Sequence, residues 1–316
     1  MPLMSNILVT GCGGDIGISV CRLLKKHDIA DQVFGCDIHN DHPGSHFFDK
    51  CFTIERADSV LYLESLEKII TANDISMVIP ISEAELRLFS RMPVKTELYN
   101  AKIITANFES MAIGFDKLET SAFLKEKKME YPWTIPTSEG LPMEIPCILK
   151  NRYGSGSRDV RLIESLGEAR LFQHRSDNDI WQEYLEPDHE EYTCAVFVSG
   201  SNLTDIRTII MKRELQGGLT GKGEVSEDQK IGTLLCRLAK EIQLRGSINV
   251  QLRLTKRGPV IFEINPRFSS TIVFRDLLGF QDLLWVIQDA CGLNVARYKN
   301  PKSGTRFFRS AKEIII

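Results

Sequence analysis

The first hundred residues alternate short apolar strands with amphipathic helices, and this pattern constrains the fold more than any other feature of the chain. The expected strands are 7–10, 32–36, 76–80 and 102–104, and the expected helices are 18–26, 59–71 and 83–91. Strands that alternate with helices form a parallel sheet with helices on its faces. The sequence therefore predicts an α/β fold with a doubly wound parallel sheet in this part of the chain.

A glycine-rich turn, residues 11–17, follows the first strand and precedes the first helix. Its glycine spacing, together with Asp37 after the second strand, matches the fingerprint of a dinucleotide site. The same glycines could instead allow only a tight strand-to-helix turn with close packing and no nucleotide. On this segment alone both interpretations stay open.

Histidines and aspartates gather in the loop that follows, namely His39, His42, His46, Asp37, Asp41 and Asp49. The loop contains proline and glycine, and no second set of ligands is nearby in the sequence. A metal site of this composition needs ligands held at fixed spacing. We therefore expect an ordinary polar loop here and no metal site.

A second pattern lies near the end of the chain. Two alternating runs, 248–255 and 259–264, flank a Lys-Arg-Gly turn and predict a β-hairpin. Alternation places Asn249, Gln251 and Arg253 on one face of the first strand and Glu263 and Asn265 on one face of the second. A solvated hairpin face is the alternative, but these polar residues stand within otherwise apolar strands.

The hairpin carries oxygen donors that can converge. One carboxylate and two amide groups, from Glu263, Gln251 and Asn265, suit a hard cation such as Mg²⁺ that also takes phosphate oxygens. Arg267 follows two residues later, where a guanidinium could hold a transferring phosphoryl group. The hairpin thus predicts a metal and phosphate site.

The middle of the chain contains further phosphate-binding features. A helix is expected from Asp116-Lys117 to about 128, and the strand 146–150 ends at Lys150. The Gly/Ser-rich connection 151–158 could fold its backbone N–H groups over phosphates, or it could be only a turn. Residues 180–186 are typical of an edge segment whose backbone could bind an adenine. Strands at 193–198 and about 207–213, a glycine-rich loop at 214–225 and a final strand in 306–316 complete the expected elements.

In this order, these pieces resemble the ATP-grasp superfamily from about residue 115 to residue 292. The hairpin motif, Gly246 to Arg267, is most similar to the carbamoyl-phosphate-synthase branch and its small stand-alone relatives. The resemblance implies a Rossmann-like pre-ATP-grasp domain at 1–107 and a two-lobed α+β ATP-grasp module at 108–316. Within the module it implies a small, lid-bearing lobe at 108–180 and a large catalytic lobe at 181–316.

The resemblance also implies an activity. Such enzymes form an acyl-phosphate from a carboxylate and ATP, and a nucleophile, usually an amine, then displaces phosphate. The implied cofactors are ATP and Mg²⁺, with two ions, and Mn²⁺ as a possible substitute. The implied nucleotide-binding residues are Lys117, Lys150, Gly154, Ser155, Gly156, Ser157, Gln182, Glu183, Tyr184, Leu185, Glu191 and Lys212. The implied catalytic residues are Lys212, Arg213 and Arg267, and the implied metal ligands are Gln251, Glu263 and Asn265.

The acceptor pocket is expected between two segments near the phosphates. Glu83 and Glu85 follow the strand 76–80, whose carboxyl end should face a crevice. Ser269 and Arg275 follow the hairpin. Arg275 could bind a second acidic group of the substrate and the glutamates an ammonium, or Arg275 could pair with a neighbour on a solvated face.

Composition limits the class of protein. A net charge of −3 over 316 residues leaves no electrostatic footprint for nucleic acid. The apolar runs are too short to cross a membrane. The eight cysteines are scattered without a Cys-x-x-Cys pair, which suits reduced thiols in the cytoplasm. A homodimer is possible.

The chain has one ATP-grasp-like module, whereas the large subunit of carbamoyl-phosphate synthase has two, and no glutamine-hydrolysing segment is visible. We therefore expect a stand-alone ligase that joins a small-molecule carboxylate to an amine or another nucleophile. Two other classes stay open. One is a non-catalytic ATP-binding or sensing module, and the other is an NAD(P)-dependent oxidoreductase that uses the glycine turn.

Overall fold

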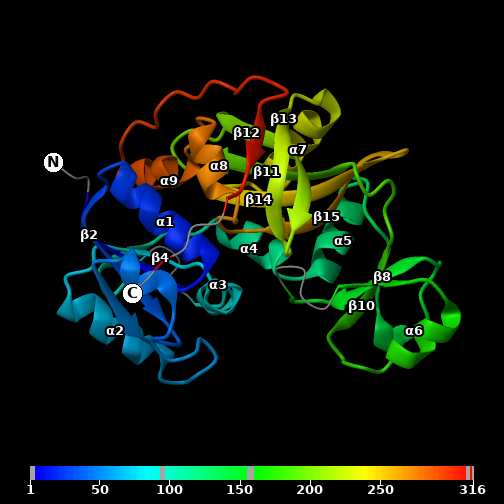
Figure 1. Ribbon diagram of the computed structural model, residues 1–316, viewed down its shortest axis with the longest axis horizontal. Coiled ribbons are helices and arrows are strands. Elements are labelled where there is room, and N and C mark those ends of the chain that lie inside the picture. The colour runs from blue at the N-terminus through cyan, green and yellow to red at the C-terminus, as the bar shows by residue number, and fades with distance from the viewer. Residues whose placement is uncertain (1–3, 93–96, 155–159, 311–313, 315–316) are drawn as a thin grey trace.

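The computed structural model describes residues 4–92, 97–154, 160–310 and 314 of the chain. It contains three sheets, which we call sheets A, B and C in chain order. In Figure 1 sheet A is blue to cyan at the lower left, sheet B is green at the right, and sheet C lies above and between them.

Sheet A is the doubly wound sheet that the sequence predicts. Its strands follow the order β3-β2-β1-β4-β6-β5, and every pair is parallel except the antiparallel pair of β5 and β6. The strands are β1 (Met4–Thr10), β2 (Ala30–Asp37), β3 (Lys50–Thr53), β4 (Met77–Ile79), β5 (Glu97–Leu98) and β6 (Ala101–Ile103). The helices are α1 (Asp15–Lys26), α2 (Tyr62–Ala72) and α3 (Glu83–Ser90), with a 3₁₀ turn, η1, at Pro43–His46. The expected strands and helices are confirmed, whereas β3 and β5 had not been predicted.

Both faces of sheet A are covered. Along β1, Ile7 and Val9 join the core formed with α1, and Leu8 between them joins the core formed with Tyr62 and Leu66 of α2. Successive side chains of a strand point to opposite faces, so helices on both sides bury a continuous apolar run.

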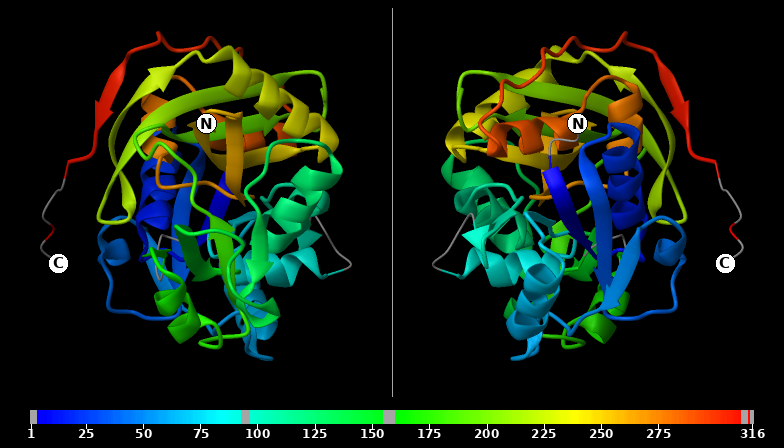
Figure 2. Two further views of the ribbon diagram at one scale, coloured as in Figure 1. Left: turned by 90° about the vertical axis from the view of Figure 1, so that its right-hand side faces the viewer. Right: turned by 90° about the vertical axis from the view of Figure 1, so that its left-hand side faces the viewer.

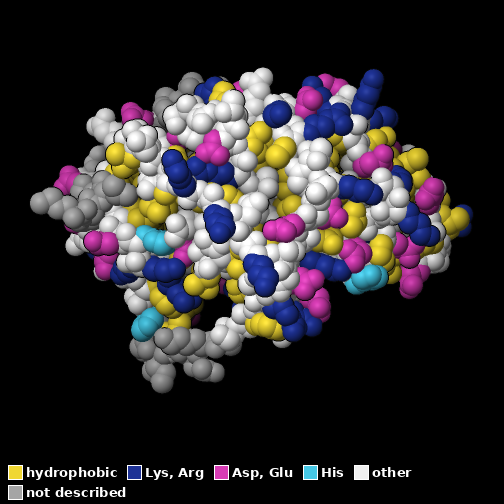
Figure 3. All heavy atoms as spheres, turned by 90° about the horizontal axis from the view of Figure 1, so that it is seen from above, with side chains coloured by type: hydrophobic (Ala, Val, Ile, Leu, Met, Phe, Trp, Pro, Cys, Tyr) yellow, Lys and Arg dark blue, Asp and Glu magenta, His cyan; other side chains and the backbone are white. Residues whose placement is uncertain are grey.

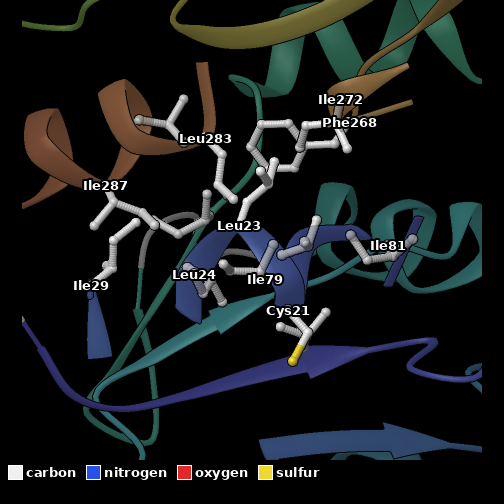
Figure 4. Packing of buried hydrophobic residues seen from close by; sticks show 14 of the residues in the cluster. Cys21, Leu23, Leu24, Ile29, Ile79, Ile81, Phe268, Ile272, Leu283 and Ile287 are labelled. Atoms are coloured by element: carbon white, nitrogen blue, oxygen red, sulfur yellow. The ribbon is translucent and has the colours of Figure 1, made fainter. Parts of the chain in front are cut away.

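The core around α1 extends into the carboxyl-terminal part of the chain (Figure 4). Leu23 and Leu24 of α1 and Ile79 of β4 lie in one buried cluster with Leu283 and Ile287 of α9 (Asp282–Ala290). The cluster also includes Phe268 and Ile272, and Ile272 is the first residue of α8 (Ile272–Leu277). Because these side chains belong to one core, they hold sheet A in a fixed position beside sheet C.

Sheet B is antiparallel, with the order β7-β10-β8-β9. Its strands are β7 (Thr134–Pro136), β8 (Cys147–Asn151), β9 (Arg161–Ile163) and β10 (Asp179–Glu183), with helices α5 (Lys117–Glu126) and α6 (Leu166–Phe172) and the 3₁₀ turn η2 (Thr137–Glu139). The expectation that residues 180–186 form an edge segment is wrong, because β10 lies between β7 and β8. The short strand β7, which contains proline, had not been recognised.

Sheet C is antiparallel, with the order β15-β14-β11-β12-β13-β16. Its strands are β11 (Glu191–Val198), β12 (Ile206–Gln216), β13 (Leu219–Ser226), β14 (Gly246–Thr255), β15 (Gly258–Asn265) and β16 (Arg306–Phe308). The helices α4 (Phe108–Gly114) and α7 (Gln229–Glu241) contribute to its core. Figure 2 shows β16, in red, at the outer edge of this sheet.

The predicted hairpin is confirmed as β14 and β15, but the predicted loop at 214–225 is wrong. Strands β12 and β13 run through most of it and leave a turn at Gly217 and Gly218, where φ is +59° and +80°. These positive φ values favour glycine. The predicted final strand covers only Arg306–Phe308 of the described tail.

No helix among the described residues is long and apolar enough to span a bilayer. On the face drawn in Figure 3, lysine and arginine side chains are interspersed with acidic ones over the whole surface. This distribution agrees with the small net charge of the chain.

Candidate nucleotide site and adjoining cavity

A cavity of about 220 Å³ lies between sheets B and C, and most of the predicted nucleotide-binding residues line it. Strands β8 and β10 form one wall, and β11, β12, β14 and β15 form the other. The predicted residues that it brings together are Lys117, Lys150, Gly154, Gln182, Glu183, Tyr184, Leu185, Glu191, Arg213, Gln251 and Glu263. Ser155, Gly156 and Ser157 lie outside the described residues.

Two lysines bring positive charge to this cavity. Lys117 and Lys150 are only 7% and 6% exposed. Burial lowers the pKa of Lys150 to about 7, with Lys117 also lowering it and Glu263 opposing the shift. The Lys117 ammonium donates to the carbonyl oxygen of Gly154 at 2.5 Å, at the start of the Gly/Ser-rich connection. Lys150 is therefore a cation whose charge depends on what enters the cavity.

Glu263 is the carboxylate that faces these lysines. Burial by itself would raise the pKa of the Glu263 carboxyl, but Lys117, Lys150, a hydrogen bond from Asn265 and Arg267 together lower it. Asn265 donates to Glu263 Oε1 at 3.0 Å, and Gln251 is the register partner of Glu263 across the hairpin. The structure thus brings the three proposed metal ligands together, and their amide and carboxylate groups have the chemistry of a Mg²⁺ site.

Glu191 is held by two arginines. Arg213 donates to Glu191 Oε1 at 2.7 and 2.9 Å and to Gln251 Oε1 at 2.8 Å. Arg253 donates to Glu191 Oε2 at 2.6 Å. Lys212, the residue before Arg213 on β12, does not line the cavity and forms an ion pair with Glu190. Of Lys212 and Arg213, the structure therefore brings only Arg213 into the cavity.

The end of the cavity near β10 has the features of an adenine site. Gln182 donates its amide N–H to Thr134 Oγ1 at 3.0 Å, which leaves its carboxamide oxygen available as an acceptor. Arg253 donates to the backbone carbonyl of Leu185 and to Asp188 Oδ1, the latter at 2.7 Å. Alternation along β14 had placed Arg253 on the face of Gln251, but no local pattern indicates that Arg253 connects sheet C to this segment.

Glu183 and Tyr184 line the same end, but their side chains are engaged elsewhere. Glu183 accepts two hydrogen bonds from Arg257, at 2.8 and 2.9 Å. The Tyr184 hydroxyl donates to Asp188 at 2.6 Å. Their backbone groups are therefore the part of this segment that a ligand would meet.

A second cavity, of about 450 Å³, adjoins the first and shares Arg213, Gln251 and Glu263 with it. Asn265, Arg267 and Ser269 line it from the hairpin side, and Gly14, Asp15 and Ile16 line it from the start of α1. Arg267 donates to Glu83 Oε1 at 2.9 Å and to the Phe268 carbonyl at 3.0 Å. Glu83 therefore holds the guanidinium group that faces this cavity.

Two of the expected substrate residues are elsewhere. Glu85 is 5% exposed, accepts from Thr10 at 2.6 Å and from Tyr62 at 2.7 Å, and caps α3. Arg275 is fully buried and pairs with Asp282 at 2.9 Å, so it lies neither in a cavity nor on a solvated face. The geometry does not support the expectation that either residue contacts substrate, because each is committed to an internal network.

The glycine turn is also internally satisfied. Asp37 accepts from the N–H of Gly13 at 2.9 Å and from the N–H of Ile38 at 2.8 Å. A Cβ on Gly13 would meet the His42 ring at 2.7 Å, so little space remains beside Gly13 itself. The geometry favours a structural turn over a dinucleotide site. The potential ligand atoms of Cys12, Asp37 and His42 lie within 4.8 Å of one another, in a group that does not include His39 or His46.

Comparisons with known proteins agree with this geometry. Residues 115–271 match the model of the ATP-grasp domain. A carbamoyl-phosphate synthase of Methanobrevibacter smithii is 24% identical over 146 residues, which cover 44% of this chain and 38% of that protein. The match thus spans well under half the length of that relative.

Solved structures extend the likeness over almost the whole chain. The ADP complex of an N5-carboxyaminoimidazole ribonucleotide synthetase aligns with a TM-score of 0.74 and 14% identity, covering 96% of this chain and 80% of that one. The biotin carboxylase domain of 2-oxoglutarate carboxylase from Hydrogenobacter thermophilus, in a complex with MgADP and bicarbonate, aligns with a TM-score of 0.69 and 16% identity, covering 96% and 73%. At these identities the likeness is one of fold. The matched model identifies residues 115–271 as an ATP-grasp domain.

Proposed function

We propose that this protein is an ATP-dependent ligase that activates a small carboxylate as an acyl-phosphate and transfers the acyl group to an amine or another nucleophile. ADP and phosphate are the other products. The observation that carries the proposal is the continuity of the two cavities at Arg213, Gln251 and Glu263. A nucleotide bound in the first cavity would direct its terminal phosphate toward an acid bound in the second.

The lysines of the first cavity suit the phosphates of ATP. Lys150 loses its proton easily in the empty site, because burial lowers its pKa to about 7. A polyphosphate beside it would restore the proton and the charge. Lys117, whose partner in this structure is the Gly154 carbonyl, would exchange that oxygen for a phosphate oxygen.

The hairpin suits the Mg²⁺ that accompanies ATP. Glu263, Asn265 and Gln251 would hold the metal, and the match between their oxygens and a hard cation supports this assignment. Bound Mg²⁺ would neutralise phosphate charge during transfer. Two ions, and Mn²⁺ as a substitute, belong to the proposal as well.

Arg267 suits the second half of the reaction. Its guanidinium faces the second cavity and is oriented by Glu83. There it would bind the substrate carboxylate and then the acyl-phosphate oxygens. A carboxylate oxygen attacks the terminal phosphorus and ADP leaves. The nucleophile then attacks the acyl carbon and phosphate leaves. Neither step requires a covalent bond to a side chain, because binding and orientation supply most of the effect.

The proposed substrates are small molecules, and the proposed compartment is the cytoplasm. All eight cysteines are free in the structure, which agrees with a reducing environment. A homodimer remains part of the proposal.

The test is ADP formation by the full chain with ATP-Mg²⁺ over a panel of small acids combined with amines. A ligase gives ADP and phosphate in equal amounts only when a suitable acid is present. An ATP sensor would be stabilised against heat by ATP-Mg²⁺ without forming ADP with any acid. Thermal stabilisation by NADH and none by ATP-Mg²⁺ would overturn the nucleotide assignment.

A further inference from the structure

Two cysteine thiols meet beneath the glycine turn, outside the nucleotide site. Cys12 lies in the turn after β1 and is fully buried, whereas Cys51 on the edge strand β3 is half-buried. Their sulfur atoms are 3.9 Å apart, and the Cys12 thiol donates to Cys51 Sγ. Cys12 Sγ also lies 3.7 Å from His42 Nε2. Nothing in the proposed ligase reaction uses these groups.

The backbone builds this contact. Strand pairing places Gly35 of β2 opposite Cys51 of β3. A Cβ on Gly35 would lie 2.6 Å from Cys12 Cβ and 2.9 Å from its sulfur, so the absence of a side chain at position 35 admits Cys12 to the space beside Cys51. The N–H of Cys12 donates to the Cys36 carbonyl at 3.1 Å, which holds the turn in place.

Hydrogen bonding at the cluster favours thiol chemistry over metal binding. The Gly44 N–H donates to His42 Nδ1 at 3.1 Å, so the proton of a neutral ring is on Nε2, the nitrogen that faces Cys12. A protonated nitrogen cannot bind a metal. Each carboxylate oxygen of Asp37 already accepts a backbone N–H. A metal would have to displace the Nε2 proton and compete with these backbone hydrogen bonds, whereas the hydrogen bond from Cys12 already brings the two sulfurs together.

We propose that Cys12 and Cys51 form a redox-active dithiol that closes to a disulfide by exchange with a low-molecular-weight disulfide such as oxidised glutathione. The Cys51 thiolate attacks one sulfur of oxidised glutathione, which forms a mixed disulfide and releases one glutathione. The Cys12 thiol then attacks the Cys51 sulfur, and its proton passes to the departing thiolate, which leaves as the second glutathione. Two protein thiols are oxidised while one glutathione disulfide is reduced to two thiols.

The environments of the two sulfurs give them different roles. Cys51 is on an edge strand within reach of solvent, and the hydrogen bond from Cys12 lowers the pKa of Cys51. The same bond, burial and the charge of Cys51 raise the pKa of Cys12. Once Cys51 is in a mixed disulfide, that bond and charge are gone, and His42 Nε2–H lies beside Cys12 to stabilise its thiolate. Cys51 is thus the attacking residue and Cys12 the resolving one.

Closure of the disulfide affects the second cavity. A disulfide bond is about 2.05 Å long, so the two sulfurs must approach by roughly 2 Å. Cys12 is two residues before Gly14, which lines that cavity with Asp15 and Ile16. Oxidation should therefore shift one wall of the cavity. This consequence for substrate binding rests on the proposed function, whereas the thiol chemistry does not.

The test uses the full-length protein without nucleotide, incubated with mixtures of reduced and oxidised glutathione. Free thiols are alkylated after acid quenching, and peptides are mapped by mass spectrometry. We expect Cys12 and Cys51 to escape alkylation together, in one cross-linked peptide pair, while the other six cysteines become alkylated. In Cys12→Ser, Cys51 should stop at the mixed disulfide with glutathione. In Cys51→Ser, Cys12 should stay reduced because it is buried.

Cys236→Ser is the matched control, because Cys236 is also half-buried but lies on α7, and it should leave the cross-link unchanged. In the reduced wild type, alkylation of Cys51 should be about tenfold faster than that of Cys236. Hydrogen exchange at residues 13–17 should differ between the reduced and oxidised forms.

Three results would overturn the proposal: Cys51 pairing with a cysteine other than Cys12, equal reactivity of Cys51 and Cys236, or co-purified zinc that protects both thiols until it is chelated. Each can be read whether or not the protein hydrolyses ATP, so failure here is distinct from failure of the ligase proposal.

Discussion

Buried charges occur in two neighbouring regions of this protein, and they are balanced differently. In the nucleotide cavity, the charged groups that act on Lys150 are Glu263, Lys117 and Glu191, and Glu191 is already held by Arg213 and Arg253. Behind the second cavity, Arg275 faces one carboxylate, that of Asp282. The second pair also has hydroxyl partners, since Ser269 accepts from Arg275 at 3.1 Å and Ser247 donates to Asp282 at 2.6 Å. Once Glu191 is paired with the arginines, Glu263 is the carboxylate that balances both lysines, whereas Arg275 and Asp282 are matched one to one.

This difference distinguishes a binding site from a structural element. Burial of an ammonium group is unfavourable in the empty protein and Lys117 nearby adds to the cost, so the pKa of Lys150 is lowered. A matched pair with hydrogen-bond partners stabilises its own surroundings but offers nothing to a ligand. Substitutions in the cavity should therefore affect binding and turnover, whereas substitutions in the pair should affect stability.

Asp282→Asn should produce the largest free-energy change. It leaves the Arg275 guanidinium as an uncompensated charge at a fully buried position, and we expect a loss of about 3–5 kcal/mol in the free energy of unfolding. Denaturant unfolding measures it. The double variant Arg275→Met/Asp282→Leu removes both charges and should be less destabilised than the single variant. If Asp282→Asn unfolds like the wild type, the pair is not structural and the comparison fails.

Glu263→Gln should have the second-largest effect, on the rate of ADP formation. It removes the carboxylate of the proposed metal site, and we expect turnover to fall on the order of 10²–10³-fold. The fold should tolerate the change, because Lys150 can release its proton near neutral pH. The free energy of unfolding should thus change by less than about 1 kcal/mol. Near-normal ADP formation at moderate Mg²⁺ would mean that the metal is held elsewhere.

How far the sequence predicted these regions depends on the physical signal at each residue. Glu263 and Asn265 were assigned to one face because the two-residue period of a strand is visible in sequence. The burial of Arg275 was not predicted because it depends on the packing of α8 and α9 against α1, which local pattern does not reveal. The internal hydrogen bonds of Glu85 were not predicted because its partners, Thr10 and Tyr62, are far away in the chain.

Short strands limited the prediction of the fold in the same way. The parallel sheet A was predicted from the alternation of apolar strands with amphipathic helices. Strand β3 has only four residues and β7 only three, too few to show a period. Missing β7 led to the wrong expectation of an edge at 180–186, and missing β3 concealed the meeting of Cys12 with Cys51. Pairing between distant segments, and not local composition, determines these features.

The pH dependence of nucleotide binding should give a smaller effect that depends on Lys150. Its pKa is about 7 in the empty site and should rise beside phosphates, so the protonated form binds better. Affinity for MgADP should be greatest near or below pH 7 and should fall by at most about tenfold per pH unit above it, until the pKa of the complex is reached. Calorimetry between pH 7.5 and 9 in buffers of different ionisation enthalpy measures both the affinity and the proton uptake.

In Lys150→Arg the charge is permanent, so the slope of affinity against pH should disappear. An unchanged slope in this variant would assign the titration to another group. Above about pH 7.5 the terminal phosphate of the nucleotide is already ionised and does not contribute to the slope.

Glu83→Gln should give the smallest effect. It tests whether an ion pair that lies beside a cavity affects substrate binding, as the cavity residues do, or stability, as the buried pair does. Glu83 and Arg267 form a matched pair like Arg275 and Asp282, but their side chains are 15% and 12% exposed and Arg267 faces the second cavity. A partly exposed pair contributes about 1 kcal/mol, so KM for the acid found in the panel should rise roughly fivefold as Arg267 loses its orientation. Affinity for ATP should stay within a factor of about three, because Glu83 does not line the nucleotide cavity.

Glu85→Gln is the control two residues away. It disturbs the contacts with Thr10 and Tyr62, so it should lower stability and leave KM unchanged. If instead Glu85→Gln raises KM while Glu83→Gln does not, the acid binds on the sheet A side of α3, and Arg267 is oriented by something other than Glu83.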